Sequence, residues 1–186
     1  MINIKIPHLA NKYGFTLIEL VVVFSIMAVL STIGIASFVN YSRMQTLQQA
    51  QNDLMTAINT AKSMSVAQTT ASTANGNSLD CSGQSFSGYG VHLYKNTTPN
   101  SYALYIKCPT GPKFAASAFL PKNVIFGSST ATYDVFFPIL IGGVTGNGQI
   151  VLDGSALGLP VAGSLKTIVV DSGGNIGNIV APTPMP

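Results

Sequence analysis

The sequence predicts an α+β protein, in which one long and partly transmembrane N-terminal helix packs on a C-terminal antiparallel β domain. Three observations predict this fold. Residues 15–39 form an apolar run, residues 40–68 repeat small and apolar side chains at helical spacing, and residues 69–180 hold short β-rich stretches between Gly- and Ser-rich turns. A basic leader at 1–14 precedes these segments. A Pro-rich tail at 181–186, expected to be disordered, follows them.

The leader carries the basic residues Lys5 and Lys12 and no acid. Positive charge ahead of an apolar run keeps that flank on the cytoplasmic side of a membrane. The whole chain has nine Lys and Arg residues against six Asp and Glu; if the leader is removed, seven basic residues remain against six acidic. This nearly neutral balance contains no basic stripe and therefore does not favour binding to nucleic acid.

The apolar run at 15–39 is about 37 Å long as a helix, enough to cross a hydrocarbon core of about 30 Å. It contains one acid, Glu19. An acidic side chain deep in a membrane helix costs about 2.5–3.5 kcal/mol, so Glu19 requires a cationic partner. Cleavage after Gly14 would supply one, because the new amine of Phe15, with a pKa near about 8, would lie one helical turn from Glu19.

The segment from Gly14 to Leu20, followed by three valines, resembles the class III signal of type IV pilins and pseudopilins. The resemblance implies cleavage after Gly14 by prepilin peptidase and methylation of the new N-terminal Phe15. It also implies that Glu19 pairs with the N-terminal amine of a neighbouring subunit during filament assembly. The implied function is that of a non-catalytic structural subunit, a minor pilin or pseudopilin of a type IV pilus or a type II secretion pseudopilus.

The resemblance also implies partners and a location. The partners are prepilin peptidase, other pilin or pseudopilin subunits, and membrane lipid before assembly. The precursor would cross the bacterial inner membrane once with its C-terminal domain outside the cytoplasm, and the assembled filament would be periplasmic or on the cell surface.

Two other interpretations of the N-terminus remain open. An ordinary secretory signal could be cut near Ala36 and release a soluble domain beginning near Ser37. A simple signal anchor could hold the chain in the membrane with no role in assembly. The first interpretation leaves Glu19 in an apolar core that ordinary signals avoid, and the second leaves the junction of Gly14 and Phe15 unexplained.

Residues 40–68 predict an amphipathic continuation of the helix. Its apolar stripe should face the β domain, and its polar face should lie opposite. The stripe consists of Leu47, Ala50, Leu54, Ala57, Ile58, Ala61 and Met64, and the polar face of Gln48, Gln49, Asn52, Asp53, Asn59 and Lys62.

Alternating and β-branched stretches predict the strands of the β domain. Pro138 indicates an edge strand or a bulge, and residues 172–175 indicate a hairpin turn. The uninterrupted run Ile168 to Val170 suggests a strand buried on both faces. The predicted strands are 89–94, 102–108, 124–126, 133–141, 149–152, 166–171 and 176–180.

Cys81 and Cys108 are the only cysteines. On the outer side of a membrane they would form one disulfide, worth about 2–4 kcal/mol, in an oxidising compartment. Two free thiols or half of a metal site are the alternatives, but no C-x-x-C spacing occurs and His92 is the only histidine outside the leader.

A helix followed only by strands also resembles the pilin and pseudopilin subgroup related to GspH and FimT. The supporting residues are Leu54 to Ser65 and Thr167 to Ile176. Some members of that subgroup bind DNA through a Gly-Arg-x-Arg-like motif, but the comparable stretch here, 174–178, has no arginine, and Arg43 is the only arginine in the chain. A DNA-uptake or adhesive tip pilin that binds its ligand through the β domain is the alternative function.

No residue pattern predicts catalysis, a cofactor or a metal site. The Gly-rich stretch 142–148 leads into a strand pattern, whereas a phosphate loop leads into a helix. Ser85 lacks the second Gly of a nucleophile elbow, and His92 lies in a strand pattern. Asp153 and Asp171 could offer oxygens to Ca²⁺, but they are isolated where calcium takes six to eight ligands.

Overall fold

A computed structural model of the chain describes residues 14–68, 71–72, 78–115, 117–139, 142–160 and 163–179. The chain divides into two compact units, Met1–Val39 and Asn40–Pro186, and each is described by itself. The leader as far as Tyr13 and the tail from Val180 onward lie outside the described residues, so the predictions for them stay predictions.

One helix, α1 (Leu17–Ala67), passes through both units. Thr16 precedes its first turn and Gln68, with a φ of 50°, follows its last. The bounds of α1 lie within two residues of the range 15–68 over which the sequence predicts one helix. No helix among the residues described is long and apolar enough to cross a membrane.

In the first unit, α1 carries large apolar side chains on every side. None of those described between Leu17 and Val39 is buried. The hydroxyls of Ser25 and Ser31 donate to the carbonyls of Val21 (2.8 Å) and Met27 (2.7 Å), one turn earlier. These serines therefore satisfy their own hydroxyls within the helix and need no partner outside it.

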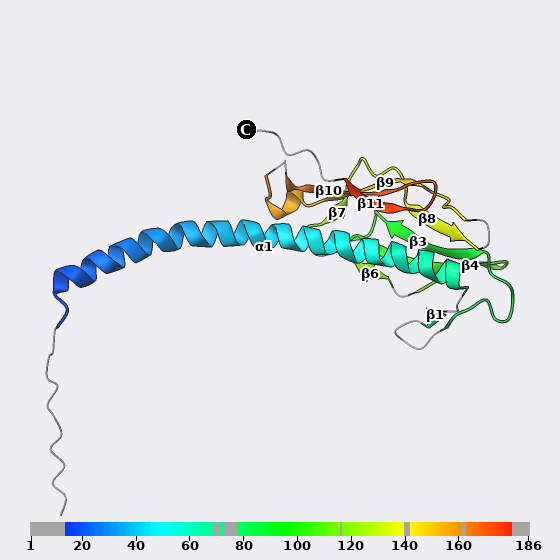
Figure 1. The fold of residues 1–186 in the computed structure, drawn as a ribbon, viewed down its shortest axis with the longest axis horizontal. Coiled ribbons are helices and arrows are strands. Elements are labelled where there is room, and N and C mark those ends of the chain that lie inside the picture. Colours follow the sequence, from blue (N-terminus) through cyan, green and yellow to red (C-terminus); the bar gives the residue numbers. More distant parts are fainter. Residues whose placement is uncertain are drawn as a thin grey trace, which may run out of the picture. The chain divides into compact units, whose positions relative to one another are not determined.

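In the second unit, α1 turns one stripe of side chains into the core. The predicted stripe is confirmed, with Ala57 and Met64 half-buried at its margin. The predicted polar face is exposed except for Lys62, which is half-buried. Figure 1 shows this part of the helix lying along the β strands. The fully buried members of the stripe are Leu47, Ala50, Leu54, Ile58 and Ala61.

The strands form antiparallel sheets. The larger has the order β5-β4-β3-β8, with β6 also paired to β4, and the second has the order β11-β10-β9-β7. A hairpin of β1 and β2 stands apart from both. The elements are β1 (Ala71–Ser72), β2 (Ser78–Leu79), β3 (Gly88–Tyr94), β4 (Ser101–Cys108), β5 (Gly111–Phe114), β6 (Ala118–Phe119), β7 (Ile125–Phe126), β8 (Asp134–Pro138), β9 (Gly148–Asp153), β10 (Leu165–Val170), β11 (Ile176–Ile179) and the short 3₁₀ helix η1 (Ser155–Leu157).

Polar side chains of α1 form hydrogen bonds to strands of both sheets. Gln51 donates from Nε2 to the carbonyl of Thr167 on β10 (3.3 Å) and to Oδ1 of Asn178 on β11 (3.1 Å). Ser65 donates to the carbonyl of Phe137 on β8 (2.8 Å). Because these bonds are directional, they fix the position of the helix along the apolar core more closely than apolar contacts alone would.

The structure corrects the prediction for Ile168 to Val170. Ile168 and Val170 are buried, but Val169 between them is half-buried, so the strand alternates. Val169 lies opposite Gln149 on β9 and Gly177 on β11. At Val169 the outer face of β10 is therefore only partly covered, and the continuous apolar run misled the prediction.

Candidate functional site

The N-terminal segment is the first candidate site. Gly14, Phe15 and Thr16 precede α1, the side chain of Phe15 is 81% exposed, and that of Glu19 is exposed as well. A Cβ atom placed on Gly14 would meet nothing within 4 Å. The peptide bond between Gly14 and Phe15 therefore lies in an uncrowded stretch of chain just outside the helix.

Thr16 caps the helix at the residue before its first turn. Its Oγ1 accepts a hydrogen bond from the amide of Glu19 (3.3 Å), and its carbonyl accepts one from the amide of Leu20 (3.2 Å). Glu19 is thus the third helical residue, and Thr16 and Glu19 have the spacing of a capping box. The prediction from sequence overlooked this cap, although a Thr three residues before a Glu at the start of an apolar run is a recognised signal.

The position of Glu19 in the first turn suits its charge. The unpaired amides at the start of a helix carry partial positive charge, which favours a carboxylate there. Within the described part of the chain Glu19 forms no ion pair. Its predicted partner, the amine of Phe15 of a neighbouring subunit after cleavage, stays a prediction.

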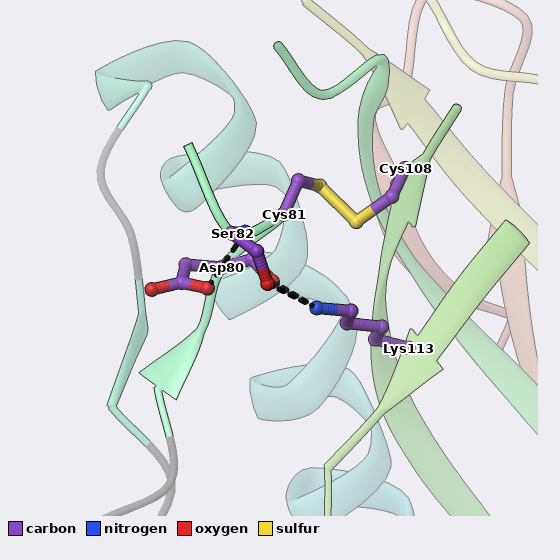
Figure 2. The surroundings of a disulfide bond; sticks show 5 residues. All are labelled: Asp80, Cys81, Ser82, Cys108 and Lys113. Carbon is purple, nitrogen blue, oxygen red and sulfur yellow. Dashed lines mark hydrogen bonds between the residues drawn. A yellow bond between two sulfur atoms is a disulfide. The ribbon is translucent and has the colours of Figure 1, made fainter. Parts of the chain in front are cut away.

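The two cysteines are joined. Cys81 lies after β2 and Cys108 ends β4, with both side chains buried and their Cα atoms 5.5 Å apart. Figure 2 shows Lys113 of β5 beside them. Lys113 donates from Nζ to the carbonyl of Asp80 (2.9 Å) and to Oγ of Ser82 (3.2 Å). A covalent bond and a lysine therefore hold the same short loop against the edge of the larger sheet.

Asp153 and Asp171, the two candidate calcium ligands, each accept hydrogen bonds from residues two to four positions later in the chain. Oδ1 of Asp153 accepts the amide of Ser155 (2.7 Å), and Asp171 accepts the side-chain and backbone N–H groups of Asn175 (both 2.8 Å). These bonds from Asn175 lower the pKa of the Asp171 carboxyl. No group of three His, Cys, Asp or Glu side chains suited to a metal ion occurs among the described residues.

The remaining residues that the sequence raises as candidates for catalysis or phosphate binding lie on separate elements and do not form one site. Ser85 lies in the loop before β3, and His92 lies on β3 with Nδ1 3.8 Å from Oδ2 of Asp134. The Gly-rich stretch leads into β9, as predicted, and Thr145 within it pairs with Phe136 of β8. This stretch is therefore a connection packed on the larger sheet.

Comparison with known proteins identifies the N-terminal segment. The family model described as the prokaryotic N-terminal methylation motif matches residues 9–35, a range that includes Gly14, Phe15 and Glu19. No curated protein and no solved structure matches the chain. The N-terminal segment of the chain therefore carries a prokaryotic N-terminal methylation motif.

Proposed function

We propose that this chain is a non-catalytic structural subunit, a minor pilin or pseudopilin, of a type IV pilus or a type II secretion pseudopilus. The observation that carries the proposal is that the described apolar side chains of α1 between Leu17 and Val39 are all exposed, with Glu19 as the acid in the first turn of the helix. Each Å² of apolar surface left in water costs about 25 cal/mol. A helix that is apolar all round is therefore covered by lipid or by other helices.

Before assembly, lipid of the bacterial inner membrane covers this surface. The serine hydroxyls suit that environment, because hydroxyls bonded to their own helix demand nothing from hydrocarbon. The Cys81–Cys108 disulfide in the second unit suits an oxidising compartment outside the cytoplasm. The proposed topology is a cytoplasmic leader, the apolar stretch 15–39 in the membrane and an outer β domain. The membrane span in this proposal rests on the sequence of that stretch, since no helix among the described residues is by itself long and apolar enough to cross a membrane.

Prepilin peptidase then cuts after Gly14, and Phe15 is methylated. In the filament the helices of neighbouring subunits replace lipid, and Glu19 accepts the amine of a neighbour's Phe15. A carboxylate left unpaired in that apolar surrounding would cost about 2.5–3.5 kcal/mol, so the pair selects the arrangement in which both charges are neutralised. The exposed position of Gly14 and Phe15 ahead of α1 supports access by the peptidase.

The test is the substitution Glu19→Ala. We expect leader removal to proceed as in the wild type and incorporation into filaments to fall about tenfold or more, because about 1.4 kcal/mol of lost pairing already corresponds to a factor of ten. Incorporation is measured as the amount of the chain in sheared filaments relative to the membrane pool, and processing by intact mass.

Ser25→Ala is the matched control. Ser25 is a polar residue of the same exposed apolar stretch, but its hydroxyl bonds only to its own helix. We expect this variant to be incorporated normally. Incorporation of Glu19→Ala at the wild-type level would contradict the proposed ion pair.

A further inference from the structure

Aromatic side chains gather on one face of the larger sheet. Because successive residues of a strand point to opposite faces, Tyr89, Val91 and Leu93 of β3 enter the core while the residues between them lie on the outer face. The same alternation on the neighbouring strands completes the set. We call it the aromatic face, and it consists of His92, Tyr94, Tyr105, Phe114 and Phe136.

The rings of the aromatic face touch one another. Tyr105 lies at the centre, 5% exposed, with ring centroids 5.4 Å from Phe114 and 6.1 Å from Phe136. His92 meets Tyr94 at 4.7 Å and Phe114 at 6.0 Å, both edge to face. Phe114 is 45% exposed, and Tyr94, His92 and Phe136 are partly exposed. No ligand fits between rings at these distances, so a ligand must lie upon them.

Two glycines make this arrangement possible. A Cβ atom on Gly90 would lie 2.5 Å from Cζ of Tyr105, and one on Gly88 would lie 2.8 Å from Cζ of Phe136. Both contacts are far shorter than real side chains show. The sequence therefore leaves space on β3 for rings from β4 and β8 to lie close against the sheet.

Polar groups are placed among the rings and their charges balance. Asp134 accepts the hydroxyl of Tyr105 at Oδ1 (2.7 Å) and has a 55% exposed side chain beside His92. The Nζ of Lys107 lies 5.1 Å from the centroid of Phe136. Asp134 and Lys107 thus lie among the rings of the aromatic face with opposite charges.

The aromatic face continues into a hollow of about 370 Å³. Its wall includes His92 and Tyr94 from the aromatic face, together with Tyr133, Lys95 and Asn96. Lys95 donates from Nζ to the hydroxyl of Tyr133 (3.2 Å), which holds its amine at the edge of the hollow. Residues with aromatic, amide and amine side chains therefore line one concavity beside the aromatic face.

We propose that the aromatic face and this hollow bind a neutral carbohydrate chain. The C–H faces of pyranose rings lie against aromatic faces, to whose negative π surface they are attracted, and sugar hydroxyls find hydrogen-bonding partners in Asp134, Asn96 and Lys95. Nucleic acid is a poorer fit, because phosphates would meet the exposed carboxylate of Asp134 and find only two lysines, Lys107 beside the rings and Lys95 at the hollow. Binding does not depend on the proposed assembly role, and failure of one leaves the other intact.

The experiment titrates the full chain with cellohexaose and with chitohexaose in a detergent that contains no sugar, with binding followed by calorimetry. We expect the wild type to bind at least one of them and Phe114→Ala to weaken that binding about fivefold or more. Leu165→Ala is the matched control, because Leu165 is 47% exposed, close to the 45% of Phe114, but belongs to β10 of the other sheet. It should change the affinity less than about twofold.

Asp134→Asn is the second variant. It keeps an oxygen that can accept the hydroxyl of Tyr105 and removes the charge, so we expect weaker binding with an unchanged melting temperature. Absence of binding to both hexasaccharides would overturn the proposal. So would equal affinity in Phe114→Ala and the wild type, or binding of a thymidine oligonucleotide in place of the sugars.

Discussion

At the scale of single residues, two glycines with nearly the same positive φ have different surroundings. Gly146 and Gly83 have φ values of 79° and 82°. A Cβ on Gly146 would collide with the carbonyl of Asp134, whereas one on Gly83 would meet nothing within 4 Å. Both sites disfavour a side chain because of their positive φ, but only Gly146 also lacks the space for one.

We therefore predict that Gly146→Ala lowers the free energy of unfolding by about 2 kcal/mol or more, because strain and a backbone collision add. Gly83→Ala should cost only about 1 kcal/mol, the strain of the backbone conformation alone. Urea unfolding of the chain in micelles measures both. Equal losses in the two variants would show that the contact with Asp134 relaxes without cost.

Tyr105 predicts a dependence of stability on alkaline pH. Burial first, and then the hydrogen bond to Asp134 and its charge, raise the pKa of the Tyr105 hydroxyl above its ordinary value of 10.0. Above pH 10 the unfolded chain loses this proton while the folded chain keeps it. The native state then binds more protons, so stability falls as the pH rises.

The measurement is the urea midpoint of the wild type and of Tyr105→Phe between pH 8 and about 11. We expect the wild type to lose stability more steeply with pH than the variant, which has no hydroxyl to ionise at this position. Tyr102, whose pKa burial also raises, remains in both proteins and contributes equally. Parallel curves would contradict the assignment to Tyr105.

Single polar residues were the hardest to predict from sequence. Gln51 and Ser65 lie within the helical stretch and belong to neither of its two predicted faces, yet both are buried. Their partners on β10, β11 and β8 are more than 70 positions away in the chain. Periodicity reports which face a residue occupies, and contains no information about such distant carbonyls.

At the scale of secondary-structure elements, the longer helix and strands could be predicted from the sequence and some of the short strands could not. The helical stripe and the longer strands β3, β4, β9 and β10 have enough residues to show a period, and the structure confirms them. β5 contains Gly111 and Pro112, which disfavour strands, and β6 has two residues. Both were missed, because their pairing with β4 is a tertiary interaction.

The length of chain that the Cys81–Cys108 disulfide closes predicts how much the bond contributes to the free energy of unfolding. The bond closes 27 positions of chain, and removing such a closure costs about 2–4 kcal/mol. We predict this loss of unfolding free energy for the double variant Cys81→Ser with Cys108→Ser. Reduced wild-type protein should unfold at the same urea concentration as the variant. A midpoint that stays unchanged after reduction, verified by mass, would contradict the prediction.

The variant Lys113→Ala tests the contribution of the Lys113 hydrogen bonds to stability separately from that of the disulfide. Its hydrogen bonds to Asp80 and Ser82 are exposed, and exposed contacts of this kind contribute about 1 kcal/mol or less. We expect the lysine variant to unfold close to the wild type.

At the scale of the whole molecule, the two units differ in what covers their apolar residues. In Asn40–Pro186 the buried apolar residues among those described form one shared core of helix and sheets. In Met1–Val39 the described apolar side chains have no such cover within the chain. An apolar run without period and an amphipathic stripe are distinct patterns in the sequence, and the boundary between them at 39 and 40 coincides with the boundary between the two units.

The identity of the mature N-terminus tests whether the chain is processed as a prepilin, as a secretory precursor or not at all. We predict a mass and N-terminal sequence that begin at methylated Phe15, and slower leader removal in Gly14→Ala. Intact mass spectrometry of membrane and filament fractions measures both. A chain beginning near Ser37 would indicate an ordinary secretory signal, and one that retains Met1 would indicate an unprocessed anchor.

The helix cap at Thr16 has a consequence for proteolysis. A protease needs its substrate in extended form, and unwinding a helix to provide it costs free energy. Among the described residues, the first carbonyl used by α1 is that of Thr16, one residue beyond the bond between Gly14 and Phe15. Hydrolysis of that bond would remove none of the described hydrogen bonds of the helix. After cleavage, α1 would therefore keep all of its described hydrogen bonds and would not have to refold.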